Sequence, residues 1–346
     1  MSKLKEALIK VSEGKDLSPN ETEAAFAEIV TGDFDERVLA GLLVGLKVKG
    51  ETWEEIAAVA RTLRKAALKV PHNVPPEEPL VDTCGTGGDR KGTFNVSTAA
   101  AFVVAAAGIK VAKHGNRSVS SKCGSADVLE ALGVKIDMPP EMAAECLSTC
   151  GICFLFAPLY HPAMKNVAPV RKALSLRTIF NLVGPLLNPA GANTQVLGVS
   201  DFRLTEKMAF ALDALGSKRA LVVFGEGGYD EFVVTGSTKV SELREGRITT
   251  YYVDPPDVGL ELCEEPEELL GGDAEENARI IREILLGKET GPKRDMVALN
   301  AGAAIYAAEA VIDLKAGVKK ALEILSAGKA IDKLEELVAF SQRHTQ

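Results

Sequence analysis

The sequence contains no apolar run of membrane-spanning length, so we expect no transmembrane helix. Its first residues, Met1–Glu6, predict an amphipathic helix rather than a signal peptide. Positive charge is not in excess either, because the formal net charge is −8. A broad nucleic-acid-binding surface is therefore not expected. Together these absences predict a soluble cytoplasmic protein that binds neither membranes nor nucleic acids.

Cysteine is also scarce, with six residues in 346. Most of the six lie in apolar surroundings, which favours reduced thiols in the cytosol. Cys146, Cys150, Cys153 and His161 are near enough in sequence to suggest a zinc or redox site. However, Cys146 and Cys150 lie one helical turn apart on a predicted buried face, and Cys153 begins a predicted buried strand. We therefore interpret these thiols as small hydrophobic groups rather than metal ligands.

The chain divides at a proline-rich linker, Pro71–Pro79. Residues 1–70 carry only helical signals and predict a small all-helical N-terminal domain. Its third helix, Asp35–Gly50, is apolar around most of its circumference, which fits either a buried core helix or a subunit interface. Residues 71–346 alternate short β-forming runs with helices, which predicts an α/β domain with a mainly parallel sheet flanked by helices.

Three loops rich in glycine and small polar residues follow predicted strands or open a helix early in this second domain. They are Gly85–Asp89, Asn95–Thr98 and Lys113–Ser121. Because ligands bind at strand ends in open α/β sheets, these loops predict one shared site. Glycine lets backbone amides approach an anion, a helix N-terminus attracts it, and lysine adds positive charge. The stretch predicts a cradle for a phosphorylated, and specifically a pyrophosphorylated, small molecule.

The glycines alone are a weak signal. Gly85, Gly87 and Gly88 have neither the Rossmann nor the Walker spacing, and a tight turn with positive φ would explain one or two of them. A turn does not explain why so many polar side chains crowd the same strand ends. This crowding favours the anion site.

In order and spacing, the three loops resemble the blocks of the anthranilate phosphoribosyltransferase family. The similarity covers nearly the whole chain. It continues through Gly124–Gly133, His161–Met164, Arg171, Arg177–Asn181, Gly184–Leu186, Asn188–Pro189 and Asp230–Glu231.

This resemblance implies a reaction, a cofactor and an assembly. The 5-phosphoribosyl group would pass from 5-phosphoribosyl 1-pyrophosphate to the amine of anthranilate, with pyrophosphate leaving, in the second step of tryptophan biosynthesis from chorismate. Two Mg²⁺ ions would assist, held by Ser97, Asp230 and Glu231. Helices from about 165–190 would join the helical domain, and that domain would form a homodimer.

The resemblance also assigns the two substrates to residues. Anthranilate would contact Gly85, Asn116 and Arg171, and the candidate catalytic residues are His114 and Arg171. Alternatively, Arg171 could form a surface salt bridge and His114 could merely pack or hydrogen bond. The residues assigned to the sugar pyrophosphate are Gly85, Gly88, Asp89, Thr93, Asn95, Val96, Ser97, Thr98, Lys113, His114, Gly115, Asn116, Arg117, Ser118, Val119, Ser120, Ser121 and Ser125.

Two other functions remain open on the sequence. One is a pyrimidine nucleoside phosphorylase-like enzyme, although its glycine loop has a different pattern. The other is a non-catalytic, nucleic-acid-binding relative of the same fold, although the negative net charge disfavours it. Phe224 and Tyr229 depart from the residues expected beside Asp230 and Glu231, which puts fine substrate geometry in doubt but not the reaction.

Overall fold

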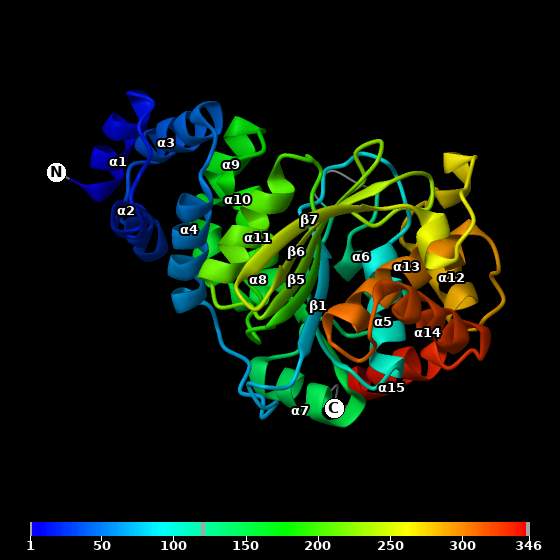
Figure 1. Ribbon diagram of the computed structural model, residues 1–346. Helices are drawn as coiled ribbons and strands as arrows, with labels where there is room; N and C mark the ends of the chain where they lie inside the picture. Colours follow the sequence, from blue (N-terminus) through cyan, green and yellow to red (C-terminus); the bar gives the residue numbers. More distant parts are fainter. Residues whose placement is uncertain (1, 119–121, 344–346) are drawn as a thin grey trace.

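A helical lobe forms the N-terminal end of the computed structural model, which describes residues 2–118 and 122–343 (Figure 1). The first residue of each helix follows a side chain that accepts a hydrogen bond from the first turn: Ser2, Ser18, Asp35 and Thr52. Such caps satisfy amides that have no partner within the helix. The four helices are α1 (Lys3–Ser12), α2 (Pro19–Thr31), α3 (Glu36–Lys49) and α4 (Trp53–Ala66).

A segment from the middle of the chain returns to this lobe. It comprises η1 (Pro162–Val167), α9 (Ala168–Leu174), α10 (Ile179–Val183) and η2 (Gly184–Leu186). Of these, η1 packs against α2, α9 against α3, and α10 against α3 and α4. Val167, Val170, Ile179 and Phe180 are buried in the same apolar cluster as the first four helices. The lobe is therefore built from two stretches of chain that are far apart in sequence.

The sheet confirms the predicted α/β class. Its seven strands lie in the order β3-β2-β1-β4-β5-β6-β7. The first five in this order pair in parallel. Strand β6 then pairs with β5 in the antiparallel sense, and β7 pairs with β6 in the same way. The strands are β1 (Leu80–Gly85), β2 (Lys110–Gly115), β3 (Ile152–Phe156), β4 (Thr194–Gly198), β5 (Arg219–Gly225), β6 (Thr238–Arg244) and β7 (Arg247–Val253).

Alternate residues of β5 enter two separate cores, because successive side chains of a strand point to opposite faces. Leu221 and Val223 pack in the larger core, whereas Ala220 and Val222 pack in the core shared with the helical lobe. Figure 1 shows α11 and the lobe on one side of the sheet and α5, α13, α14 and α15 on the other. The flanking helices are α5 (Val96–Ala106), α6 (Ser125–Ala131), α7 (Pro140–Cys150), α8 (Ala157–Tyr160), α11 (Leu204–Ala214), α12 (Ala274–Leu285), α13 (Pro292–Ala307), α14 (Leu314–Ser326) and α15 (Ala330–Gln342), with the short η3 (Pro255–Val258) and η4 (Pro266–Leu269).

In the parts of the chain that the structure describes, no helix combines the length and the apolar character that crossing a bilayer requires. All six cysteines are buried, and none of them forms a disulfide. The Cys146 thiol donates to the Ile152 carbonyl at 3.2 Å, and the Cys150 thiol to that of Glu336 at 3.7 Å. Over the described ranges, no three His, Cys, Asp or Glu side chains are arranged to hold a metal ion.

Helices α13 and α14 touch backbone to backbone at Gly302 and Gly317. A Cβ atom at Gly302 would lie 2.5 Å from the Val318 nitrogen. We expect Gly302→Ala to lower the free energy of unfolding by about 1–3 kcal/mol, because overpacking forces the backbone apart. Gly41→Ala in α3 is the matched control, since its nearest neighbour is a Leu8 side-chain atom at 3.2 Å. Chemical denaturation should show the control to be neutral or more stable, and equal effects would contradict a tight contact.

Candidate active site

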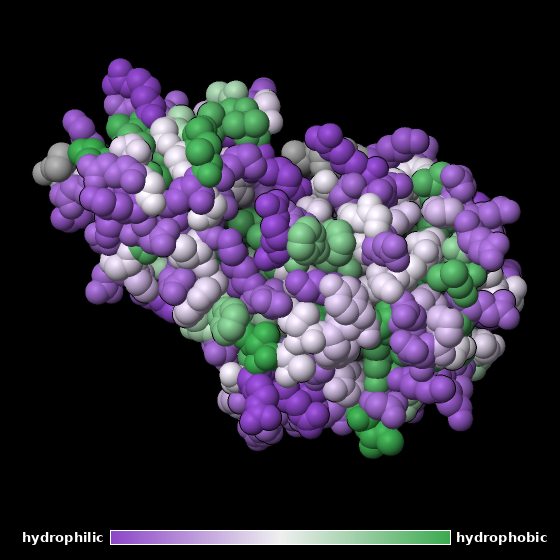
Figure 2. Space-filling model, turned by 45° about the horizontal axis from the view of Figure 1, so that its top comes forward, coloured by the Kyte–Doolittle hydropathy of each residue, from purple (hydrophilic) through white to green (hydrophobic). Residues whose placement is uncertain are grey.

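The strand order reverses between β1 and β4, and an open α/β sheet is expected to have a crevice at the carboxyl ends of two such strands. The chain runs from β1 to β2 and β3 on one side, and then places β4 on the other side of β1. Loops leaving such a switch point diverge and make room for a ligand. The glycine-rich loop follows β1, and the loop with Asp230 and Glu231 follows β5, the neighbour of β4. Figure 2 shows an indentation between the helical lobe and the α/β body, bordered mainly by hydrophilic residues on this face.

Asp230 crosses this switch point in close contact with two strand ends. A Cβ atom at Gly198 would lie 1.5 Å from the Asp230 carbonyl oxygen, and one at Gly85 would lie 2.6 Å from its Oδ2 atom. The Gly87 amide donates to the same Oδ2 atom at 2.6 Å. Gly85 and Gly198 are therefore required for the acidic loop to reach the glycine-rich loop.

The two neighbouring carboxyl groups are costly in their ionised form. Burial, and then the nearby Asp89, raise the pKa of Asp230 to about 7. Burial and the Asp230 charge raise the pKa of Glu231 well above its ordinary value, although Lys113 opposes this shift. A divalent cation would favour ionisation of both groups. Two carboxylates with a nearby hydroxyl suit Mg²⁺, which keeps waters and substrate oxygens among its ligands.

Lys113 supplies a buried positive charge beneath the crevice. Its Nζ atom donates to the Thr83 carbonyl at 2.6 Å and to the Ser97 hydroxyl at 3.3 Å. Asp82, one strand away, is buried and accepts hydrogen bonds from the His114 amide at 3.1 Å and the Asn188 side chain at 2.8 Å. These contacts fix β1 against β2 and hold Lys113 next to Ser97.

The N-terminal end of α5 offers a second centre of positive potential. Its N-cap residue, Asn95, makes no side-chain cap, and the first turn holds no acidic residue. Instead, Asn95 donates to the Cys123 carbonyl at 3.2 Å and accepts from Asn277 at 2.9 Å. The Thr98 hydroxyl is buried without a hydrogen-bond partner among the described residues. An anion at this helix end would meet a positive dipole and an available hydroxyl.

His114 and His161 form a buried pair. Their Nε2 atoms are 3.1 Å apart, so one ring donates and the other accepts. Burial, and then the His161 and Lys113 charges, lower the pKa of His114 well below its ordinary value. Burial lowers the pKa of His161 to about 4. Both rings are therefore neutral near pH 7. The sequence assigned the first ring to the site but did not predict that the second would contact it.

The Arg171 guanidinium lies against an aromatic ring. It lies 5.7 Å from the centre of the Phe180 ring, and burial lowers its pKa. Over residues 2–118 and 122–343, no carboxylate forms an ion pair with it, so the alternative of a surface salt bridge has no partner there. Its planar fork is available for a ligand carboxylate.

Arg177 contacts the glycine-rich loop, although no role was expected for it from the sequence. Its guanidinium donates to the Gly87 carbonyl at 2.5 Å and to the Thr86 carbonyl at 3.1 Å. A Cβ atom at Gly88 would lie only 1.6 Å from its Nη1 atom. Arg177 thus ties the segment between α9 and α10, which packs on the helical lobe, to the glycine-rich loop. An arginine that donates to carbonyls 90 residues earlier leaves no signal in the sequence.

The third loop is held by α6. Arg117 pairs with Asp127 at 3.0 Å and with Glu130, rather than extending into the crevice. The Ser125 hydroxyl donates to the carbonyl of the exposed Asn116 at 3.3 Å, and Ser118 donates through its amide to Asp127 at 2.9 Å. Val119, Ser120 and Ser121 lie outside the described residues.

Two more of the assigned residues, Asp89 and Thr93, belong to the first loop and its exit, whereas Val96 begins α5 and Gly115 ends β2. Asp89 accepts from the Lys91 amide at 3.2 Å, and Thr93 forms an isolated bridge with Leu270. Lys91 lies over the Tyr229 ring, with its Nζ atom 5.3 Å from the ring centre. Tyr229, which differs from the residue expected in the family, therefore contacts the end of the glycine-rich loop from the acidic loop.

The chain is similar to known proteins over its whole length. Residues 5–67 match the helical bundle domain of the glycosyl transferase family, and residues 77–331 match its a/b domain. Anthranilate phosphoribosyltransferase of Desulfosudis oleivorans is 52% identical over 97% of this chain and 98% of that protein. The crystal structure of the Thermus thermophilus enzyme of that name has a TM-score of 0.92 and 47% identity, over 99% of this chain and 100% of that one. The Saccharomyces cerevisiae enzyme, solved in complex with PRPP (5-phosphoribosyl 1-pyrophosphate) and Mg, has a TM-score of 0.88 and 28% identity, over 98% and 97%. It has also been solved with 4-fluoroanthranilate.

The histidine pair makes stability depend on pH. Because both pKa values are lowered by folding, the pair's contribution is complete above the unfolded pKa of about 6.5 and is lost as the pH falls toward the folded values. We expect the ring NMR signals of His114 and His161 to stay in neutral positions from pH 8 to about pH 5.5. In His161→Gln, the loss of melting temperature on acidification should be smaller than in the parent. Titration of either ring near pH 6.5 would contradict the buried pair.

Proposed function

This chain belongs to the anthranilate phosphoribosyltransferase family, and we propose that its reaction takes place in the crevice between β1 and β4. The enzyme transfers the 5-phosphoribosyl group from 5-phosphoribosyl 1-pyrophosphate to the amine of anthranilate and releases pyrophosphate, a step of tryptophan biosynthesis. One observation carries the location: the buried Asp230 reaches across the switch point to the glycine-rich loop. Neither a phosphorylase nor a nucleic-acid-binding role is favoured by these relatives.

The leaving pyrophosphate is the demanding part of this reaction, because negative charge collects on it as the bond to the sugar breaks. We assign it to the Gly85–Asp89 loop, the Asn95–Thr98 turn and Lys113. The uncapped end of α5 and the buried lysine are already in place, so they need no rearrangement as charge develops. The third loop and Ser125 would cover the ribose and its phosphate.

Mg²⁺ is the metal that these residues fit. The yeast relative was solved with PRPP and Mg. We propose two ions in this chain, one near the Ser97 hydroxyl and a second held by Asp230 and Glu231. When bound there, Mg²⁺ would offset the negative charge of the pyrophosphate. The protein's own part is to hold two buried carboxyl groups side by side. Burial and a neighbouring negative charge raise the pKa of each, and a bound cation would favour their ionised forms.

Anthranilate brings a carboxylate and a neutral aromatic amine. We assign the carboxylate to Arg171, whose fork is free, with Gly85 and Asn116 nearby in the proposed site. The amine attacks without prior deprotonation, so no strong base is needed. His114 is kept as the proposed proton acceptor, because it is neutral and its ring is oriented by His161. The protein then acts mainly by positioning.

The assembly remains as the sequence suggested. We propose a helical domain of residues 1–70 with helices from about 165–190, an α/β domain of residues 71–346, and a homodimer through the former. Val48 and Ile9, which are 82% and 45% exposed on α3 and α1, offer apolar surface for that contact. Sedimentation velocity tests the dimer. Six buried cysteines without a disulfide support a reducing compartment, the cytoplasm.

The loss of anthranilate fluorescence on adding 5-phosphoribosyl 1-pyrophosphate and Mg²⁺ measures the reaction directly. We expect Asp230→Asn combined with Glu231→Gln to reduce the rate at least about 100-fold, because the metal loses its anionic ligands. Without metal, the same variant should melt higher than the parent, since two buried carboxyl groups that are costly to ionise are replaced by neutral amides. Glu226→Gln, an exposed carboxylate of the same loop, is the control and should stay active. A fully active double variant would refute the metal assignment.

Arg171 and Arg177 should separate the two substrates. Arg171→Ala should raise the KM for anthranilate about tenfold or more, because a charge-assisted fork is lost. Arg177→Ala should instead raise the KM for 5-phosphoribosyl 1-pyrophosphate, since the glycine-rich loop loses its two anchors, and Arg177→Lys should recover only part. Steady-state kinetics with each substrate varied gives the comparison. If both variants raised the same KM, one of the two assignments would be wrong.

A further inference from the structure

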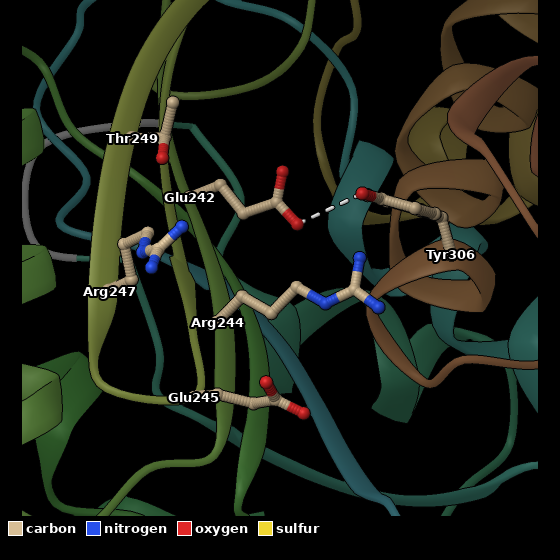
Figure 3. A pocket seen from close by; sticks show the side chains of 6 residues that line it. All are labelled: Glu242, Arg244, Glu245, Arg247, Thr249 and Tyr306. Carbon is tan, nitrogen blue, oxygen red and sulfur yellow. Dashed lines mark hydrogen bonds between the residues drawn. The ribbon is translucent and has the colours of Figure 1, made fainter.

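A second cavity lies at the other end of β5 from the metal carboxylates. It has a volume of about 470 Å³ and opens beside the β6–β7 hairpin and α13 (Figure 3). Its lining residues are Glu242, Arg244, Glu245, Arg247, Thr249 and Tyr306. Arg219, the first residue of β5, contacts Glu242 and the Tyr306 ring, whereas Gly225 at the far end of the strand leads to Asp230. This cavity therefore has no part in the phosphoribosyl transfer.

The strand register places three arginines in one row across three strands. Arg219 pairs with Arg244, and Arg244 pairs with Arg247, so all three side chains lie on one face. The turn between the last two holds Glu245 and Gly246 at φ values of 50° and 73°, which fixes the two strands tightly together. Directly opposite like charges destabilise a sheet. The row therefore places three positive charges side by side, and their repulsion does not stabilise the sheet.

The first arginine of the row is fully used by the protein. The Arg219 side chain is only 7% exposed, pairs with Glu309 and lies 3.4 Å from Glu242. Glu242 also accepts hydrogen bonds from Tyr306 at 3.0 Å and Tyr251 at 2.9 Å. We call this group, Arg219, Glu242, Tyr251 and Tyr306, the floor of the cavity, because its polar side chains are paired with one another or with Glu309. Glu242 has few lone pairs left to offer the other two arginines.

The other two arginines have few ion-pair partners among the described residues. Arg244 is 55% exposed, and its one ion pair among the described residues is with Glu309 at 3.7 Å. Within the described parts of the chain, Arg247 has no carboxylate within ion-pair distance. Figure 3 shows both side chains on the same side of the hairpin as Glu242. Two guanidinium groups that share a cavity can both donate to one ligand that carries several anionic oxygens.

We propose that this cavity binds a small oxyanion with at least two anionic oxygens, either a phosphate or a dicarboxylate, between Arg244 and Arg247. The ligand relieves the repulsion within the row, and the floor of Arg219 and Glu242 holds the hairpin in the receptive geometry. Glu245 lines the same cavity and opposes the ligand with its charge. Removing the charge of Arg244 or Arg247 should therefore weaken binding, and removing the charge of Glu245 should strengthen it.

Arginine side-chain NMR on the full-length protein tests the site, because phosphate can also enter the active site. The probes are inorganic phosphate and succinate, each titrated at constant ionic strength with sodium chloride. We expect saturable shifts of the Arg244 and Arg247 Nε–Hε signals. The signal of Arg203, an exposed arginine paired with Asp201 elsewhere, should not shift. Shifts with one probe only identify the ligand as phosphoryl or dicarboxylate.

Three variants decide the outcome. Arg247→Gln should weaken binding of the active probe about tenfold or more, and Glu245→Gln should tighten it. Without ligand, Arg247→Gln should melt at or above the parent's temperature, since a like-charge pair is removed. Arg203→Gln should leave binding unchanged. Absence of saturable shifts with both probes, or equal shifts of Arg203, would overturn the proposal, as would weaker binding in Glu245→Gln. The rate of phosphoribosyl transfer should be the same in all of these variants, so failure here leaves the proposed function untouched.

Discussion

The close approach of Asp230 to the ends of β1 and β4 is the constraint on which the rest of the site depends. Two glycines, Gly85 and Gly198, leave the space that this loop occupies. Through that space the acidic loop reaches the Gly87 amide, and the carboxyl group becomes buried beside Glu231. A parallel sheet offers one such place, where its strand order reverses. The fold therefore determines where a cation and a polyanion can meet.

Around this point, the protein provides charge without committing it to protein partners. Arg171 has no ion pair in the described chain, the end of α5 has no acidic cap, and the Thr98 hydroxyl has no partner there. Other charges nearby do have protein partners: Lys113 is anchored to Thr83 and Ser97, Arg177 to the glycine-rich loop, and Arg117 to Asp127 and Glu130. Unsatisfied groups cost stability in the free protein. They are retained where a ligand later satisfies them.

Local patterns made much of this predictable. The helical start of the chain, the parallel sheet and the three polar loops follow from composition, capping and strand ends, and the family resemblance supplied the reaction. What stayed hidden depends on contacts between distant residues. His161 meets His114 from 47 residues away, Asn277 meets Asn95 from 182, and Arg177 meets Gly87 from 90. Each partner is unremarkable in its own neighbourhood, because its role comes from topology rather than from nearby sequence. The row of Arg219, Arg244 and Arg247 is equally hidden, since only strand register aligns them.

The two-part construction of the helical lobe has a consequence for how the protein is made. Helices α1–α4 end at Ala66, but the residues that complete their core begin in η1, α9 and α10 and continue into α11. A chain growing at roughly 5–20 residues per second exposes the first four helices on the ribosome for on the order of ten seconds before their partners are synthesised. During that interval the apolar faces of α3 and α4 are uncovered while β1, β2 and β3 are added. The N-terminal lobe is thus synthesised first, but its core is completed late. When the later segments pack on it, the lobe becomes attached to the α/β domain.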